Sequence, residues 1–149
     1  MHRNIANIIH PGDLSSTAAI EYAVRHLRVS HIVLCGHTRC GGAAAALGNE
    51  PLGILEPWLL PLREIKERNS EELSKLSADE AGLKMVEWNV LEGIKTLKRK
   101  DLVIEAMRER GLQVHGLIYD VGSGQLREVE GKDSERDINA KLAALNTGA

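Results

Sequence analysis

The sequence is poor in cysteine and has no long apolar run. Its 149 residues contain only two cysteines, Cys35 and Cys40. Two thiols this close, on either side of a predicted strand end, argue against a structural disulfide and favour a reducing compartment. No run approaches the roughly 18 to 20 apolar residues that a membrane-spanning helix needs. The start, MHRNIANIIHPGD, lacks the apolar core and small-residue cleavage site of a signal peptide. We therefore expect a cytoplasmic protein.

An excess of one charge sign is also lacking. The net charge is −2, with 27% charged and 43% hydrophobic residues, an ordinary composition for a globular chain. This balance gives no electrostatic reason to expect nucleic acid or a membrane as a partner. The length predicts a single domain over residues 1–149, in which residues 130–149 form a charged C-terminal tail with a short helix over 138–145.

The chemically richest stretch is HIVLCGHTRCGG, residues 31–42. Its apolar part predicts a buried strand over 32–35, and Gly36 allows a sharp exit from that strand. His37 and Cys40 follow, and imidazole and thiolate are both zinc ligands. Gly41 and Gly42 then leave backbone N–H groups unshielded where an alanine-rich helix begins, which favours binding of an anion or an anionic substrate.

The remaining pattern predicts an α/β fold with a mainly parallel β-sheet flanked by helices. Residues 4–9 are a strand candidate that ends at a Pro-Gly-Asp turn, and a helix capped by Ser15, Ser16 or Thr17 leads from it to the strand at 32–35. This strand-helix-strand unit implies a parallel crossover. Further helices are expected at 58–68, 83–97 and 102–110, a mobile surface helix or loop at 70–81, and a strand and hairpin at 112–129. Gly111 is expected to end the helix at 102–110.

The sequence resembles the β-class carbonic anhydrases. That family follows a strand of the type I-V-x-C-G-H with a zinc-binding His-x-x-Cys-Gly-Gly, and this chain has IVLCGHTRCGG. Further similar segments occur in family order: HRNIAN, TAAIEYAVRHL, PWLLPLREI, NVLEGI and VHGLIYDVGSG. The resemblance implies reversible hydration of carbon dioxide, with CO2 and bicarbonate as substrates and zinc as cofactor held by His37 and Cys40.

Part of the family pattern is not found in these residues. The family takes another zinc ligand, and an Asp-Arg pair that orients the zinc-bound water, from a Cys-x-Asp-x-Arg stretch upstream of HRNIAN, whereas here Met1 directly precedes that segment. The resemblance therefore implies a β-carbonic anhydrase-like fold without its first strand and N-terminal helical arm. It also implies an incomplete active site with weak or no hydratase activity, and the catalytic residues stay unassigned.

Several residues are candidates to complete the zinc site. His10 and Asp13 follow the first predicted strand and are the best substitute ligands. Cys35 is expected to point into the core, away from His37, because neighbouring strand residues face opposite sides and a turn is predicted between Cys35 and His37. His115 matches a histidine common in the last strand of the family and is expected to be structural. Arg3 resembles an arginine that binds bicarbonate at a regulatory site in some relatives, although the partner residues for that role are not found.

Three functions remain open from the sequence. The first is a zinc-dependent carbonic anhydrase, and the second is a divergent enzyme of the same scaffold that acts on another small carbonyl or carboxylate substrate. The third is a non-catalytic binding protein. The strand absent from the pattern is central in the family sheet, so a gap must close. We expect either that the strand at 4–9 shifts to pair with the strand at 32–35, or that a second chain supplies a strand in a homodimer or higher homo-oligomer.

Overall fold

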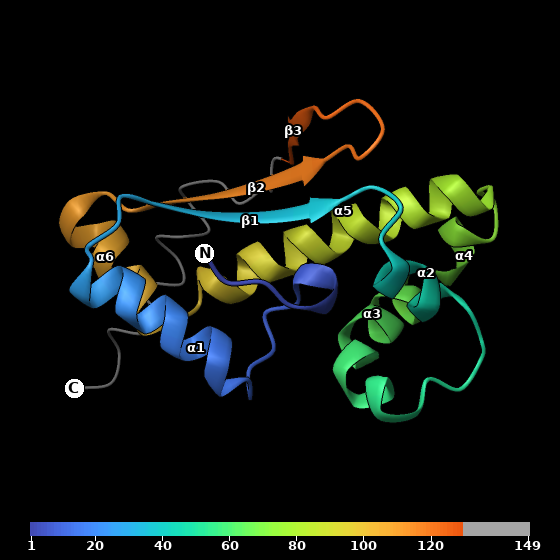
Figure 1. Ribbon diagram of the computed structural model, residues 1–149, viewed down its shortest axis with the longest axis horizontal. Coiled ribbons are helices and arrows are strands. Elements are labelled where there is room, and N and C mark those ends of the chain that lie inside the picture. Colours follow the sequence, from blue (N-terminus) through green and yellow to red (C-terminus); the bar gives the residue numbers. More distant parts are fainter. Residues whose placement is uncertain (130–149) are drawn as a thin grey trace.

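A small mixed sheet forms the centre of the computed structural model, which describes residues 1–129 (Figure 1). Strand β1 (His31–His37) runs parallel to β2 (Gln113–Tyr119), and β3 (Leu126–Glu128) lies antiparallel on the far edge of β2. Isoleucine, valine and leucine in β1 and β2 favour the extended backbone. The fold is thus of the α/β type. Strands β1 and β2 form a parallel pair, and β2 and β3 form the predicted C-terminal hairpin.

Helices make up most of the remaining structure. After β1 come α2 (Gly41–Leu47), the 3₁₀ turn η3 (Gly53–Leu55), α3 (Glu56–Arg68), α4 (Ser70–Leu73), α5 (Ala78–Leu97) and α6 (Asp101–Arg110). The helices expected at 58–68, 83–97 and 102–110 are confirmed. Helix α5 starts earlier than predicted because Ser77 and Glu80 form a capping box. Gly111 ends α6 with a φ of 70°, as predicted.

The helices that flank the sheet lie on one of its faces and beyond its ends. Figure 1 places α1 (Leu14–Glu21) and α5 on the same side of the strands. A β-carbon at Gly36 would lie 2.9 Å from Val86 and Val90 of α5, so this face of β1 touches the helix directly. Every second side chain of β1, from His31 to His37, is exposed on the other face, which no described helix covers.

Residues 4–9 do not form the predicted strand. They contain the 3₁₀ turn η1 (Ile5–Asn7), in which Ala6 and Asn7 have positive φ values of 59° and 45°. Asn89 of α5 donates a hydrogen bond of 2.6 Å to the Ala6 carbonyl, and Ala6 and Ile8 are buried. The apolar pattern therefore reports burial against α5, and not pairing with a neighbouring strand.

The predicted shift of residues 4–9 to pair with β1 is wrong as well. Among residues 1–129, β2 is the only strand that pairs with β1, so the other edge of β1 is open. The Ser30 carbonyl accepts a hydrogen bond from the Gln113 amide, and the Thr38 amide donates one to the Tyr119 carbonyl. In a parallel ladder, alternate residues bond to the same neighbouring strand, so the even-numbered residues of β1 face β2. The backbone groups of the odd-numbered residues 31–37 therefore point toward the open edge.

The helix before β1 begins at Leu14, ahead of all three predicted caps, and has a different cap. Asp13, and not Ser15, Ser16 or Thr17, is the N-cap, and its carboxylate accepts hydrogen bonds of 3.1 Å from the Ser15 and Ser16 amides. Helix α1 continues into the π-turn η2 (Tyr22–His26). Without a strand at 4–9, this helix is not the expected parallel crossover.

Two further predictions concern the C-terminal tail and the possibility of a membrane-spanning helix. The helix predicted over 138–145 and the C-terminal tail lie outside the described residues. Over the described part, α5 is the longest helix, and no helix combines the length and apolar character that crossing a membrane requires.

Candidate metal site at the end of β1

His37 is the last residue of β1, and its side chain is exposed. Its Nδ1 lies 2.9 Å from the Thr38 carbonyl oxygen. A carbonyl oxygen can only accept, so Nδ1 carries the proton in this hydrogen bond. In a neutral imidazole with this hydrogen bond the lone pair is on Nε2, which is the form that binds a metal.

The loop from β1 to α2 holds Cys40 in a fixed position. The Thr38 amide donates to the Tyr119 carbonyl at 2.9 Å, and the Thr38 hydroxyl accepts from the Val121 amide at 3.0 Å. Arg39 then takes a left-handed conformation with a φ of 57°, which reverses the chain. Cys40 becomes the N-cap of α2 and is 7% exposed. Sequence reasoning missed Thr38 as the residue that fastens this loop to the end of β2.

Gly41 and Gly42 begin α2, as predicted, but their surroundings differ. A β-carbon at Gly41 would meet nothing within 4 Å, whereas one at Gly42 would lie 2.9 Å from the Ala6 β-carbon. Gly42 is therefore required for packing against η1. Cys40 makes no side-chain hydrogen bond to the first turn of α2, so the N-cap side chain leaves these amides uncapped.

The predicted substitute ligands do not join His37 and Cys40. Across residues 1–129, no three His, Cys, Asp or Glu side chains gather as a group that could hold a metal ion. His10 stacks on Trp58 with ring centroids 5.9 Å apart, and Asp13 caps α1. Hydrogen bonds from Ser16 and Ser15 lower the pKa of the Asp13 carboxyl. Asp13 is therefore a structural cap.

Cys35 was expected in the core, but its side chain is exposed. The prediction placed a turn between Cys35 and His37, whereas β1 continues through both residues. Side chains two positions apart in a strand share a face, so Cys35 lies on the same bare face as His37. Its thiol donates to the Gly36 carbonyl at 3.3 Å.

Asp120 and Arg39 are near neighbours, yet they do not form an orienting pair. The Asp120 Oδ1 accepts hydrogen bonds from the Ser123 amide, the Ser123 hydroxyl and the Gly122 amide, at 2.7, 3.0 and 2.9 Å. These bonds, the Ser123 amide first, and the nearby Arg39 charge lower the pKa of the Asp120 carboxyl. Its principal role is to fold the hairpin turn between β2 and β3.

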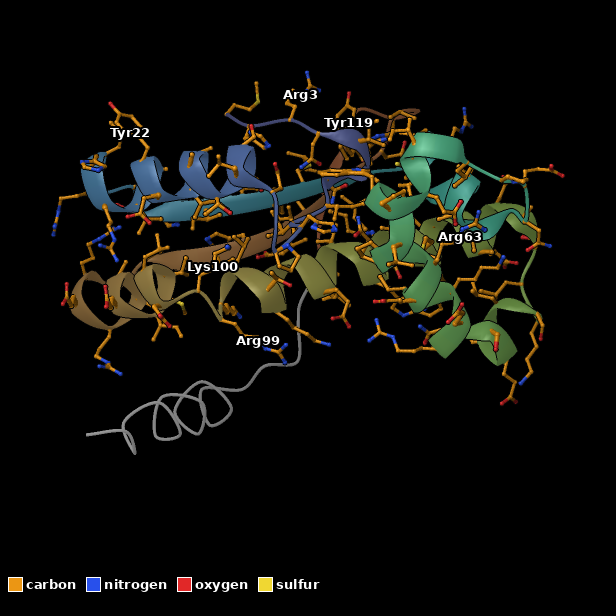
Figure 2. All side chains as sticks on the ribbon, turned by 90° about the horizontal axis from the view of Figure 1, so that it is seen from below. Arg3, Tyr22, Arg63, Arg99, Lys100 and Tyr119 are labelled. Carbon is orange, nitrogen blue, oxygen red and sulfur yellow. The ribbon has the colours of Figure 1, made fainter. Side chains whose placement is uncertain are left out.

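Two other sequence candidates lie elsewhere. Arg3 is exposed on the segment before η1, as Figure 2 shows. His115 lies in β2 and contacts His31 of β1. A cavity of about 510 Å³ is lined by residues of α2 to α5, but it reaches α2 at Ala44 and Leu47. It therefore lies away from Cys40, which caps the other end of α2.

The comparisons with known proteins identify the scaffold on which this site is built. The family model described as carbonic anhydrase matches residues 1–126. A crystal structure of the β-carbonic anhydrase CafA of Aspergillus fumigatus superimposes with a TM-score of 0.93 at 62% identity, covering 96% of this chain and 69% of that one. The chain belongs to the β-carbonic anhydrase family.

Other relatives agree with this assignment. One of two tetrameric β-carbonic anhydrases from Sordaria macrospora gives a TM-score of 0.85 at 48% identity, over 87% of this chain and 67% of that one. A carbonic anhydrase of Emericella nidulans is 41% identical over 87% of this chain, and one of Candida albicans is 38% identical over the same share. The chain spans 58% and 47% of the lengths of these two curated relatives.

Proposed function

We propose that this chain carries part of a zinc-dependent carbonic anhydrase site, in which His37 and Cys40 are the ligands that it contributes. The observation that carries the proposal is the geometry of the β1–α2 loop. His37 lies at the end of β1 with Nδ1 engaged by the Thr38 carbonyl, and the Thr38 hydrogen bonds fix the loop that leads to Cys40. Family membership supports carbon dioxide and bicarbonate as the substrates.

The donor set fits zinc at two positions and lacks a third in the described residues. When bound by three protein ligands, zinc acts as a Lewis acid that makes a water molecule nucleophilic near neutral pH. The protein's own part is to hold the ligands and orient the reactants. The described residues contribute no Asp-Arg pair for orientation, because the Asp120 Oδ1 is already engaged in the hairpin turn.

For these 149 residues alone, we propose weak or absent hydratase activity. Losing both a ligand and an orienting pair raises the barrier, and each tenfold loss of rate corresponds to about 1.4 kcal/mol. The uncapped amides at the start of α2 favour one alternative. In it, the same scaffold binds another small carbonyl or carboxylate compound beside Gly41 and Gly42, as an enzyme or as a binding protein.

We further propose a homo-oligomer in which a second copy lies against the open edge of β1. Two buried polar atoms support a missing neighbour, since Asn4 Oδ1 and Asn7 Nδ2 have no hydrogen-bond partner among the described residues. Asn7 lies beside Gly36, because its Oδ1 would be 3.4 Å from a β-carbon there. The tetrameric relatives from Sordaria macrospora are consistent with this assembly. We propose the cytoplasm as its location.

The decisive experiment measures zinc per chain in protein purified without added metal. We expect zinc in the wild type and about one ion per chain less in His37→Ala and in Cys40→Ser, because neither ligand can be spared from so small a set. Cys35→Ser is the matched control, since it removes the other thiol and should keep the metal. Unchanged zinc content in His37→Ala or Cys40→Ser would contradict the site.

Stopped-flow hydration of carbon dioxide then separates the candidate reactions. Zinc-loaded protein with slow hydration supports the proposed incomplete site. A rate equal to that of a full-length relative would contradict it, and binding of a small carboxylate without any hydration would favour the alternative function.

A further inference from the structure

A pair of histidines lies on the bare face of the sheet, at the other end of β1 from His37. His31 Nδ1 and His115 Nε2 are 3.1 Å apart, and the ring centroids are 5.3 Å apart. The six-residue separation of His31 and His37 along a strand corresponds to about 20 Å. The pair is therefore distinct from the site at His37 and Cys40, and it was not predicted from the sequence.

We propose that His31 and His115 form a second metal site, for a divalent transition metal that prefers imidazole ligands. The distance between the two nitrogens fits chelation of one ion. With a metal–nitrogen bond of about 2.0–2.1 Å, two ligands at a right angle are about 2.9 Å apart and two in a tetrahedral arrangement are about 3.3–3.4 Å apart. The observed 3.1 Å lies between these values.

The backbone holds the two rings in place. In the parallel register Val33 pairs with His115 and His31 pairs with Gln113, which makes the two histidines diagonal neighbours on one face. His31 is exposed and the His115 side chain is 31% exposed, so an ion reaches both rings from solvent. Water or a second ligand group can fill the remaining positions around the ion.

Glu128 supplies an outer partner for His115. Its Oε1 lies 3.5 Å from His115 Nδ1, on the side of the ring opposite to His31. A carboxylate there accepts a hydrogen bond from Nδ1–H and leaves the Nε2 lone pair for the metal. Carboxylates in this outer position commonly orient metal-binding histidines. Strand β3 is thus part of the site, because it carries Glu128.

Isothermal titration with Zn²⁺ tests the site in protein that also carries His37→Ala and Cys40→Ser. This background removes the zinc ligands of the proposed function, so either proposal can fail without the other. We expect one ion per chain. Replacing an outer partner of a metal ligand typically costs about 10–100-fold in affinity. Loss of a direct ligand should cost at least as much, so His31→Ala and His115→Ala should each lower the affinity at least about tenfold. Glu128→Gln should cost at most about tenfold, because its contact is long.

Two other histidines provide matched controls. His26→Ala removes an exposed imidazole that stacks on Tyr22, and His2→Ala removes the imidazole beside the N-terminal amine. Both variants should bind Zn²⁺ like the background. Circular dichroism checks that every variant folds.

Nitrogen NMR of the imidazoles provides a second readout. Zinc should shift the signals of His31 Nδ1 and His115 Nε2 and leave those of His26 unchanged. No binding in the background protein, or equal affinity in all the alanine variants, would overturn the site. The two rings would then share a hydrogen bond only.

Discussion

Replacing Gly36 by alanine tests how closely β1 lies against α5. The new β-carbon would lie 2.9 Å from Val86 Cγ1 and 2.9 Å from Val90 Cγ2, closer than carbon atoms normally approach. Valine in a helix has one strongly preferred rotamer, so neither methyl group can turn away at low cost. Overpacking of this kind costs about 1–3 kcal/mol. The lower entropy of the unfolded alanine chain returns about 0.4–1 kcal/mol. We therefore expect a net loss of about 1–2 kcal/mol in the free energy of unfolding.

Urea denaturation followed by tryptophan fluorescence measures this loss, at one protein concentration because oligomers gain stability with concentration. Gly82→Ala is the matched control in α5. A β-carbon there meets nothing within 4 Å, so the helix should gain up to about 1 kcal/mol. In a Val86→Ala background the Gly36→Ala cost should fall by at least about 0.5 kcal/mol, since neighbouring substitutions couple. A Gly36→Ala protein as stable as the wild type would refute the close packing.

Two further changes test the elements around β1. Hydrogen bonds lower the pKa of Asp13 below its ordinary 3.8, so its contribution to stability is present above that pH and is lost as the pH falls through the lowered pKa. Asp13→Asn should therefore show a smaller loss of thermal stability than the wild type on acidification below pH 3.8, and equal losses would contradict the cap. Arg110→Gln removes hydrogen bonds to the carbonyls of Val24, Arg28 and Val29 and should cost about 1.5–3 kcal/mol in urea denaturation. Exposed Arg108→Gln is the control, and an equal effect of both changes would argue against this role.

The β1–α2 region could be predicted because its signals are local. An aliphatic run, a glycine and an alanine-rich helix start specify strand, loop and helix over residues 31–47 without help from distant residues. The error at Cys35 came from the length of the strand. His37 continues the extended backbone because β2 pairs with it at Tyr119, and that pairing depends on residues far along the chain.

Residues 4–9 show why other parts could not be predicted. A short apolar run fits either a buried strand or a buried turn, and the choice depends on what lies beside it. Here Asn89 captures the Ala6 carbonyl, and positive φ values at Ala6 and Asn7 exclude a strand. The pair of His31 and His115 was missed for a related reason, since their contact follows from the register of two strands that are distant in sequence.

The open edge of β1 leads to a prediction about assembly. Because the Thr38 amide bonds to Tyr119 of β2, the alternating ladder gives the Leu34 amide a partner in β2 and turns the Val33 amide outward. Proline lacks this N–H and is tolerated in a strand only where the group faces an unpaired edge. Val33→Pro should therefore preserve the fold. Leu34→Pro should lose a ladder bond in a buried position, at a cost of at least about 1–3 kcal/mol.

If a second copy pairs with this edge, Val33→Pro must also weaken the assembly, since it removes a donor that the partner strand would use. Sedimentation velocity at micromolar concentration should show a shift toward monomer for Val33→Pro and none for Val33→Ala, which keeps the amide while removing most of the same side chain. Equal sedimentation of the two variants would place the interface elsewhere. A compact wild-type monomer would refute the oligomer itself. Unfolding of Val33→Pro to the same degree as Leu34→Pro would show that the edge is already occupied within the chain.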